Sequence, residues 1–434
     1  MTLNICLAIL VVIGAIYALI KRYESRLVLL CAGFLMAIIS FKPMMAFQQF
    51  DKSMTNGGLI VAICSAIGFA AVISYTKCDV HLVTLLTRPL KKLGFFLLPA
   101  SMLVAGFISI SIPTLSGLGA AVGPTMIPIL LRAGFKPGCA AAAIVAATYP
   151  AYLNPGLSHN VFVSKLANWD VMTFIGTHAW VTLSVTGISI IVVMLTAFLL
   201  HDYDKSALDT VAQQTNTTTG DVEIIRPNLL YALAPLVPVI ILVLASMYLK
   251  GMKISVATAM IIGSAYALII TRKDPQKAVK EFFNGMGNGY GRILGIIIAA
   301  GVFAAGLRAC GVVDSFVAYL TTANDIAKIG GAVGPYVLGV LTGSGAAAAF
   351  AFNEAVTPHA PQFGMTIDGL GYLVNMAAAA GRKSSPLAGG VILLAGIAMT
   401  SPIEVVKRTI PSLSAFSFFC ISSHEKNQFT LGYS

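Results

Sequence analysis

The stretch GRKSSPLAGG, residues 381–390, interrupts an otherwise apolar segment of spanning length. MAAAA precedes it and VILLAGIAM follows it, so two adjacent cations, Arg382 and Lys383, stand where lipid would be expected. A charged side chain at the centre of a bilayer costs roughly 2.5–3.5 kcal/mol on insertion scales. Irregular backbone at membrane depth survives only inside protein or beside a wet cavity. The stretch therefore predicts a broken membrane helix whose break serves a binding site.

The remainder of the chain is also apolar enough for a membrane. Of its 434 residues, 57% are hydrophobic and 10% are charged, and the mean hydropathy is +0.86. Soluble proteins keep about a quarter of their residues charged. The formal net charge of +11 comes from cations clustered in short loops between apolar spans, which is how membrane topology is specified. The composition therefore predicts a polytopic membrane protein and disfavours nucleic acid as a partner.

The first span, TLNICLAILVVIGAIYALI, has no Lys or Arg before it and is followed by KRYESR. A signal peptide carries its cations ahead of the apolar region. We therefore expect an uncleaved helix whose N-terminus lies on the outer, periplasmic side. The seven cysteines are scattered without a CxxC pair, which favours small packing groups over a disulfide framework or a metal site.

Two apolar segments, 94–131 and 333–364, are too long for one crossing. Each is split by a cluster of small and hydroxyl residues, PTLSGLGAAVGP at 113–124 and LTGSGAAAAF at 341–350. We expect both segments to form re-entrant helical hairpins. A further broken membrane helix is predicted at TYPAYLNPGLSHN, residues 148–160, because its two prolines free backbone carbonyls.

The two halves of the chain resemble each other. GFAAVISYTKCD (68–79) is similar to VFAAGLRACGVVD (302–314), and TLSGLGAA (114–121) is similar to TGSGAAAA (342–349). The first hairpin is expected to open from the cytoplasm and the second from outside. The predicted fold class is an all-α polytopic membrane protein of two inverted repeats, each with a re-entrant helical hairpin and a broken transmembrane helix. The expected parts are N-terminal scaffold helices at 1–56, the first inverted repeat at 57–200, a polar cytoplasmic linker at 201–227, the second inverted repeat at 228–422 and a C-terminal tail at 423–434.

The two hairpin tips and the two broken helices are expected to converge at the middle of the membrane. Helix N-termini there would attract carboxylates, and freed carbonyls could hold a cation. The candidate substrate-binding residues are Thr114, Ser116, Gly117, Asn154, Ser158, Thr342, Gly343, Ser344, Arg382, Ser384 and Ser385. The candidate ion-coupling residues are Gly119, Pro155, Glu354 and His359.

Each candidate also has an ordinary structural interpretation. Small residues at the tips could simply allow helices to pack closely. The planar guanidinium of Arg382 suits a substrate carboxylate, but it could instead pair with Glu354 within the protein. Lys383 could extend to the membrane interface, and His159 could be a packing residue.

Four blocks of the second half resemble the DcuC-type anaerobic carriers of four-carbon dicarboxylates, within the larger ion-transporter superfamily. They are IAAGVFAAGL (298–307), LTGSGAAAAFAFNE (341–354), GRKSSPLAG (381–389) and SPIEVVKRT (401–409). The resemblance covers most of the chain. It implies a multi-pass carrier of the bacterial inner membrane that moves succinate, fumarate or malate by exchange, efflux or ion-coupled symport. It also implies a homodimer in which a mobile domain carries the site past a fixed scaffold.

The sequence leaves other functions open. An ion-coupled antiporter of the Na⁺/H⁺ type on the same architecture would need a buried acid, for which Glu354 is the main candidate. A carrier of another organic anion is also compatible. An intramembrane enzyme is disfavoured because neither HExxH nor a convincing GxSx with a placed histidine occurs. We expect no cofactor, Na⁺ or H⁺ as a possible coupling ion, and the dicarboxylate, the lipid bilayer and a second copy of the chain as partners.

Overall fold

The computed structural model describes residues 2–21, 23–87, 96–203, 227–248, 254–315 and 324–411. Within these ranges the chain forms helices and no β-strand. Five helices are long and apolar enough to cross a membrane, and a bent pair, Gly389–Ile397 with Pro402–Pro411, would make a sixth span if it counts as one. The predicted all-α polytopic membrane fold is confirmed. Most of the predicted linker and the predicted last span and tail (residues 204–226 and 412–434) lie outside the described residues.

Both predicted hairpins are pairs of helices joined by a short break. The first is α6 (Leu97–Ser111) and α7 (Leu115–Arg132), and the second is α18 (Asn324–Thr342) and α19 (Gly345–Ala355). In each pair the two helices contact each other. Both predicted broken helices are also interrupted. The first consists of α8 (Pro137–Ala146), the 3-10 helix η3 (Tyr149–Leu153) and α9 (Ser158–Leu166), and the second consists of α20 (Ile367–Lys383) and α21 (Gly389–Ile397).

Local hydrogen bonds explain why the helices restart after the hairpin breaks. Thr114 precedes α7 and its Oγ1 accepts a hydrogen bond from the Gly117 amide at 3.1 Å. Ser344 precedes α19 and its Oγ accepts one from the Ala347 amide at 3.4 Å. Such N-caps satisfy amides that a new helix would leave unpaired. Gly343 has a φ of +66°, a left-handed conformation that glycine adopts without steric cost.

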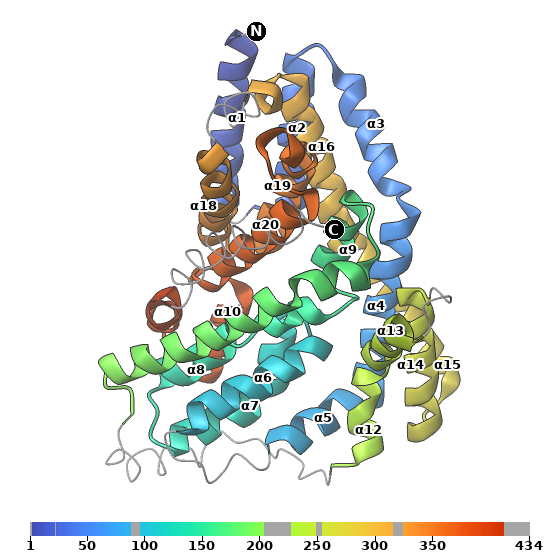
Figure 1. Cartoon of the computed structure of the whole chain (residues 1–434), viewed down its shortest axis with the longest axis vertical. Coiled ribbons are helices and arrows are strands. Elements are labelled where there is room, and N and C mark those ends of the chain that lie inside the picture. Colours follow the sequence, from blue (N-terminus) through green and yellow to red (C-terminus); the bar gives the residue numbers. More distant parts are fainter. Residues whose placement is uncertain are drawn as a thin grey trace.

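The helices form two groups around these breaks. Figure 1 shows α6, α7 and α8 side by side, with α10 (Val171–Leu199) packed along α6 and α8. In the other group, α18, α19 and α20 contact one another, and α9 contacts both α19 and α20. The first broken helix therefore reaches from one group into the other.

A bundle of long helices flanks the groups that contain the breaks. Its members include α4 (Gly57–Thr76), α14 (Val256–Thr271) and a continuous 35-residue helix, Pro275–Ala309. That long helix comprises α15 (Pro275–Gly289), a π-helical turn η6 (Tyr290–Leu294) and α16 (Gly295–Ala309). The other helices are α1 (Thr2–Ile20), α2 (Ser25–Ile39), α3 (Pro43–Met54), α5 (Cys78–Thr87), α12 (Leu229–Leu233), the 3-10 helix η5 (Ala234–Leu236), η7 (Thr357–Phe363) and α13 (Val237–Tyr248).

Buried polar contacts join the halves of the chain at several places. His178 of α10 stacks on Tyr372 of α20 with ring centroids 4.4 Å apart, and its Nε2 lies 3.3 Å from Oδ2 of Asp368. Arg408 donates two hydrogen bonds to Asp202, from Nε to Oδ2 at 2.6 Å and from Nη2 to Oδ1 at 2.8 Å. The Asp202 side chain is fully buried. These contacts connect α10 and the residues just after it to the second broken helix and the helix that follows it.

The helices α2 and α16 pack in close contact at two glycines, Gly33 and Gly306. A Cβ added at Gly306 would lie 2.5 Å from the carbonyl oxygen of Gly33, so the two backbones touch. Gly306→Ala is expected to destabilise the protein by about 1–3 kcal/mol, because overpacking forces the helices apart. Gly287→Ala is the matched control, since nothing lies within 4 Å of its added Cβ. Thermal unfolding in detergent should show a lower melting temperature for the first variant only; equal melting temperatures would contradict the close packing.

Candidate functional site

The second hairpin lies directly on the second broken helix. A Cβ added at Gly343 would lie 2.9 Å from the carbonyl carbon of Leu387. A Cβ added at Gly345 would lie 3.2 Å from Cβ of Arg382. The tip of α18–α19 therefore contacts both the last turn of α20 and the break that follows it. Residues 342–345 and Arg382, which were predicted to share a site, are neighbours.

The first broken helix adjoins the same place from the other half. The Tyr152 hydroxyl donates a hydrogen bond to the carbonyl of Asn375 at 3.0 Å, and the Asn375 side chain donates one to the carbonyl of His159 at 3.3 Å. The His159 ring stacks on Phe350 of α19, with centroids 4.8 Å apart. The break between η3 and α9 is thus held against α20 and the second hairpin. The side-chain amide of Asn160 donates hydrogen bonds to the carbonyls of Tyr152 and Asn154.

The first hairpin completes the arrangement. The side-chain amide of Asn154, within the first broken helix, donates to the carbonyl of Ile110 near the end of α6. A Cβ added at Gly389, at the start of α21, would lie 3.9 Å from Oγ of Ser116. Each interrupted element therefore contacts the next: first hairpin, first broken helix, second hairpin, second broken helix and back to the first hairpin. We call this arrangement the ring of breaks.

The predicted hydroxyl groups have local partners within this ring. Thr342 donates to the Leu338 carbonyl at 2.7 Å, and Ser384 donates to the Ala380 carbonyl at 3.1 Å while accepting from the Tyr336 hydroxyl at 3.2 Å. Ser385 accepts from the Leu387 amide at 3.2 Å. Ser116 is exposed and Ser158 half-buried. A hydroxyl can donate one bond and accept two, so these groups keep capacity for a ligand.

The predicted ion-coupling residues are not gathered in one place. Pro155 lies in the first broken helix. Gly119 is buried, and a Cβ there would lie 3.1 Å from Cγ of Leu394 on α21. Glu354 accepts a hydrogen bond from Gln49 of α3 at 3.2 Å, and Arg308 donates to its backbone carbonyl at 3.3 Å. Glu354 therefore faces α3 and α16. His359 lies beyond it, in η7.

Of the two cations of the opening stretch, Lys383 is buried and Arg382 is half-buried. Within the described part of the chain, Arg382 has no ion pair with an acid, and its buried Nε has no hydrogen-bond partner. The alternative that Arg382 pairs with Glu354 is wrong, because Glu354 faces Gln49 and Arg308. The alternative that Lys383 extends to the interface is also wrong. Lys383 is 1% exposed, and its Nζ lies 3.1 Å from the centroid of the Tyr149 ring.

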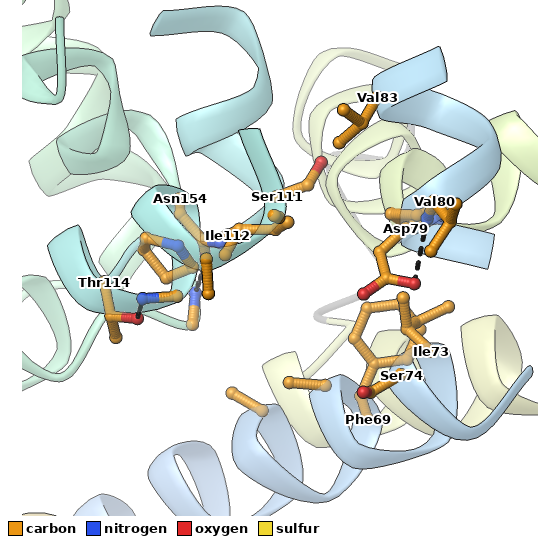
Figure 2. A pocket seen from close by; sticks show the side chains of 18 of the residues that line it. Phe69, Ile73, Ser74, Asp79, Val80, Val83, Ser111, Ile112, Thr114 and Asn154 are labelled. Carbon is orange, nitrogen blue, oxygen red and sulfur yellow. Dashed lines mark hydrogen bonds between the residues drawn. The ribbon is translucent and has the colours of Figure 1, made fainter. Parts of the chain in front are cut away.

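A cavity of about 660 Å³ lies beside the first hairpin tip. Figure 2 shows Thr114, Ile112 and Asn154 on one side of it and Asp79 of α5 on the other, with Phe69 and other residues of α4 below. Most of its lining is apolar, and Asp79 is the only charged residue among the described ones that line it. The sequence indicated neither this cavity nor the approach of α4 and α5 to the hairpin tip.

Sequence reasoning missed several residues that build the ring of breaks. Tyr149 and Tyr152 lie in η3, and Asn353 and Asn375 lie in apolar helices and share a hydrogen bond of 2.9 Å. The sequence contains part of the signal that would identify these residues. Two asparagines inside otherwise apolar membrane segments are expensive unless they are paired, and two tyrosines three residues apart stand within the predicted broken stretch 148–160.

The fold and the ring of breaks define a membrane transporter. A solved structure shares the fold: the Alcanivorax borkumensis YdaH transporter superposes with a TM-score of 0.57 and 14% sequence identity, covering 87% of this chain and 86% of that one. At this identity the likeness concerns the fold alone.

The family follows from the sequence. The DcuC family, described as the C4-dicarboxylate anaerobic carrier, matches residues 36–423, and the chain belongs to this family. The anaerobic C4-dicarboxylate transporter DcuC of Escherichia coli K12 is 27% identical over 443 aligned residues, with 94% of this chain and 93% of that protein covered. An uncharacterized transporter of Haemophilus influenzae is 41% identical over 268 residues, covering 60% of this chain and 95% of that protein. The chain is a transporter and not an enzyme.

Proposed function

We propose that this chain is a secondary active transporter that carries small dicarboxylates of the succinate, fumarate and malate type across the bacterial inner membrane. The observation that carries the proposal is Arg382, which lies in the ring of breaks without an acidic partner among the described residues. Arg382 is half-buried, and its Nε is buried without a hydrogen-bond partner in the described part of the chain. A guanidinium so placed favours a counter-charge, and its planar fork matches a carboxylate. The E. coli relative, an anaerobic C4-dicarboxylate transporter by name, supports the same substrate class.

The rest of the site is assigned by proximity to Arg382. The substrate would lie against the tip of the second hairpin, where the first amides of α19 and the hydroxyls of Thr342 and Ser344 are close. Helix N-termini favour negative charge by their dipole and free amides. Ser116 and the start of α21 would approach from the first hairpin.

Alternating access would follow from movement of the ring of breaks past the flanking helices. We propose that the two halves are inverted repeats, that their hairpins are re-entrant, and that the protein works as a homodimer with a periplasmic N-terminus. The first amides of α7 and α19, each capped by a hydroxyl, would then face the site from opposite sides of the membrane. Na⁺ or H⁺ is proposed as a possible coupling ion, alongside exchange or efflux.

Reconstitution tests the proposed function. Purified protein in liposomes loaded with unlabelled succinate should accumulate labelled succinate by counterflow, because a carrier exchanges substrate without net transport. Fumarate and malate inside should support the same uptake, and monocarboxylates of equal length should support it poorly. Varying Na⁺ and pH separately identifies the coupling ion. Uptake that is no faster than in protein-free liposomes for any four-carbon dicarboxylate would contradict the proposal.

A further inference from the structure

Lys383 is a second cation in the ring of breaks, and its surroundings are unusual for a lysine. The side chain is 1% exposed. Its Nζ has no hydrogen-bond partner among the described residues and lies 3.1 Å from the Tyr149 ring centroid. An ammonium carries three donors and no acceptor. An aromatic face attracts a cation but satisfies none of these donors as a carboxylate oxygen would.

Lys383 packs against a short helix of the other half that carries two tyrosines. Tyr149 and Tyr152 are three residues apart in the 3-10 helix η3, and side chains at this spacing lie on the same side of such a helix. Lys383 lies over the Tyr149 ring, and Arg382 directly precedes it in the last turn of α20. Tyr152 is itself fixed by its hydrogen bond to Asn375. The end of α20 therefore presents Lys383 to one rigid short element.

The backbone at this position is also fixed. The Thr409 hydroxyl donates to the Lys383 carbonyl at 3.2 Å, and the Ser384 amide donates to the Ala380 carbonyl at 3.0 Å. Four rotatable bonds of the Lys383 side chain separate this fixed backbone from the ammonium. The described part of the chain supplies neither cation with a carboxylate.

We infer that Lys383 binds the second carboxylate of the substrate and that Tyr149 holds its ammonium while the site is empty. The inference rests on the proposed function, in which Arg382 binds the first carboxylate. Half-buried Arg382 and buried Lys383 repel each other and have no carboxylate partner among the described residues, and a dianion supplies two negative charges together with hydrogen-bond acceptors. Lys383 is then the residue that makes the site prefer dianions to monoanions.

The test compares succinate with its monomethyl ester, which has one ionised carboxylate and nearly the same body. Inhibition of labelled succinate counterflow by each compound is measured for the wild type, Lys383→Met and the control Lys407→Met. Lys407 is exposed and pairs with Glu404. Wild type and control should bind succinate more tightly than the ester. In Lys383→Met the succinate preference should fall about tenfold or more, the size expected for a charge-assisted hydrogen bond, while binding of the ester changes little.

Thermal unfolding separates this role from simple packing. Met fills a similar volume without the charge, so substrate-free Lys383→Met is expected to melt no lower than the wild type, while succinate should stabilise it less. A preference for succinate over the ester that is unchanged in Lys383→Met would overturn the inference, as would equal weakening of both compounds. Absence of succinate counterflow in the wild type would instead contradict the proposed function itself.

Discussion

Arg382→Ala is expected to abolish succinate counterflow while the protein still inserts and folds. Two charge-assisted hydrogen bonds to one carboxylate would be lost, each worth about 1.5–3 kcal/mol, so the apparent affinity should fall at least about a hundredfold. Arg382→Lys should retain part of the activity, because it keeps the charge but loses the planar fork. Initial rates of labelled succinate uptake into preloaded proteoliposomes measure both effects.

The matched control for this prediction is Arg132→Ala. Arg132 is exposed at the end of α7 opposite the hairpin tip. Replacing it shows what the loss of an arginine outside the ring of breaks does to counterflow. Its variant should keep wild-type counterflow. Elution as one symmetric peak in detergent shows that each variant is folded. Full activity of folded Arg382→Ala protein would remove Arg382 from the site.

Asp202→Ala is expected to have the largest effect on stability. Its carboxylate is fully buried and receives two hydrogen bonds from Arg408. Removing one partner of such a pair leaves a largely buried charge, at a cost of about 3–5 kcal/mol. Glu404 also contacts Arg408, from Oε2 to Nη1 at 2.8 Å, which should keep the loss near the lower end. The apparent melting temperature in detergent should fall by several degrees.

A double variant distinguishes the ion pair from loss of packing. Asp202→Ala combined with Arg408→Leu removes both charges, so it should be more stable than the sum of the single variants predicts. Lys407→Ala is the control for an exposed pair, because Lys407 and Glu404 are both solvent-accessible and such pairs contribute about 1 kcal/mol or less. Additive effects in the double variant would show that the buried pair is not what joins these segments.

The sequence predicted where the membrane helices are interrupted but not how they face one another. Proline, glycine and hydroxyl residues have local effects on the backbone, and the breaks at 112–114, 154–157, 343–344 and 384–388 follow from them. Helix orientation is different. α20 is buried along nearly its whole length, so apolar periodicity gives no side that must face lipid or protein.

This limit explains the particular residues that were misjudged. Glu354 was a possible partner of Arg382, but its position on α19 directs its side chain toward α3. Extension of Lys383 to the interface was an open alternative, because nothing in the sequence shows that its ammonium lies over Tyr149 of the other half. Contacts between residues more than two hundred positions apart depend on the tertiary arrangement, which a single sequence does not reveal.

A structure determined with bound succinate tests the central claim most directly. Electron cryomicroscopy of the purified protein with saturating succinate should show the ligand in the ring of breaks, with one carboxylate on the Arg382 guanidinium and the tip of the second hairpin beside it. Succinate found only in the cavity beside Asp79, with Arg382 making no contact to it, would contradict the account.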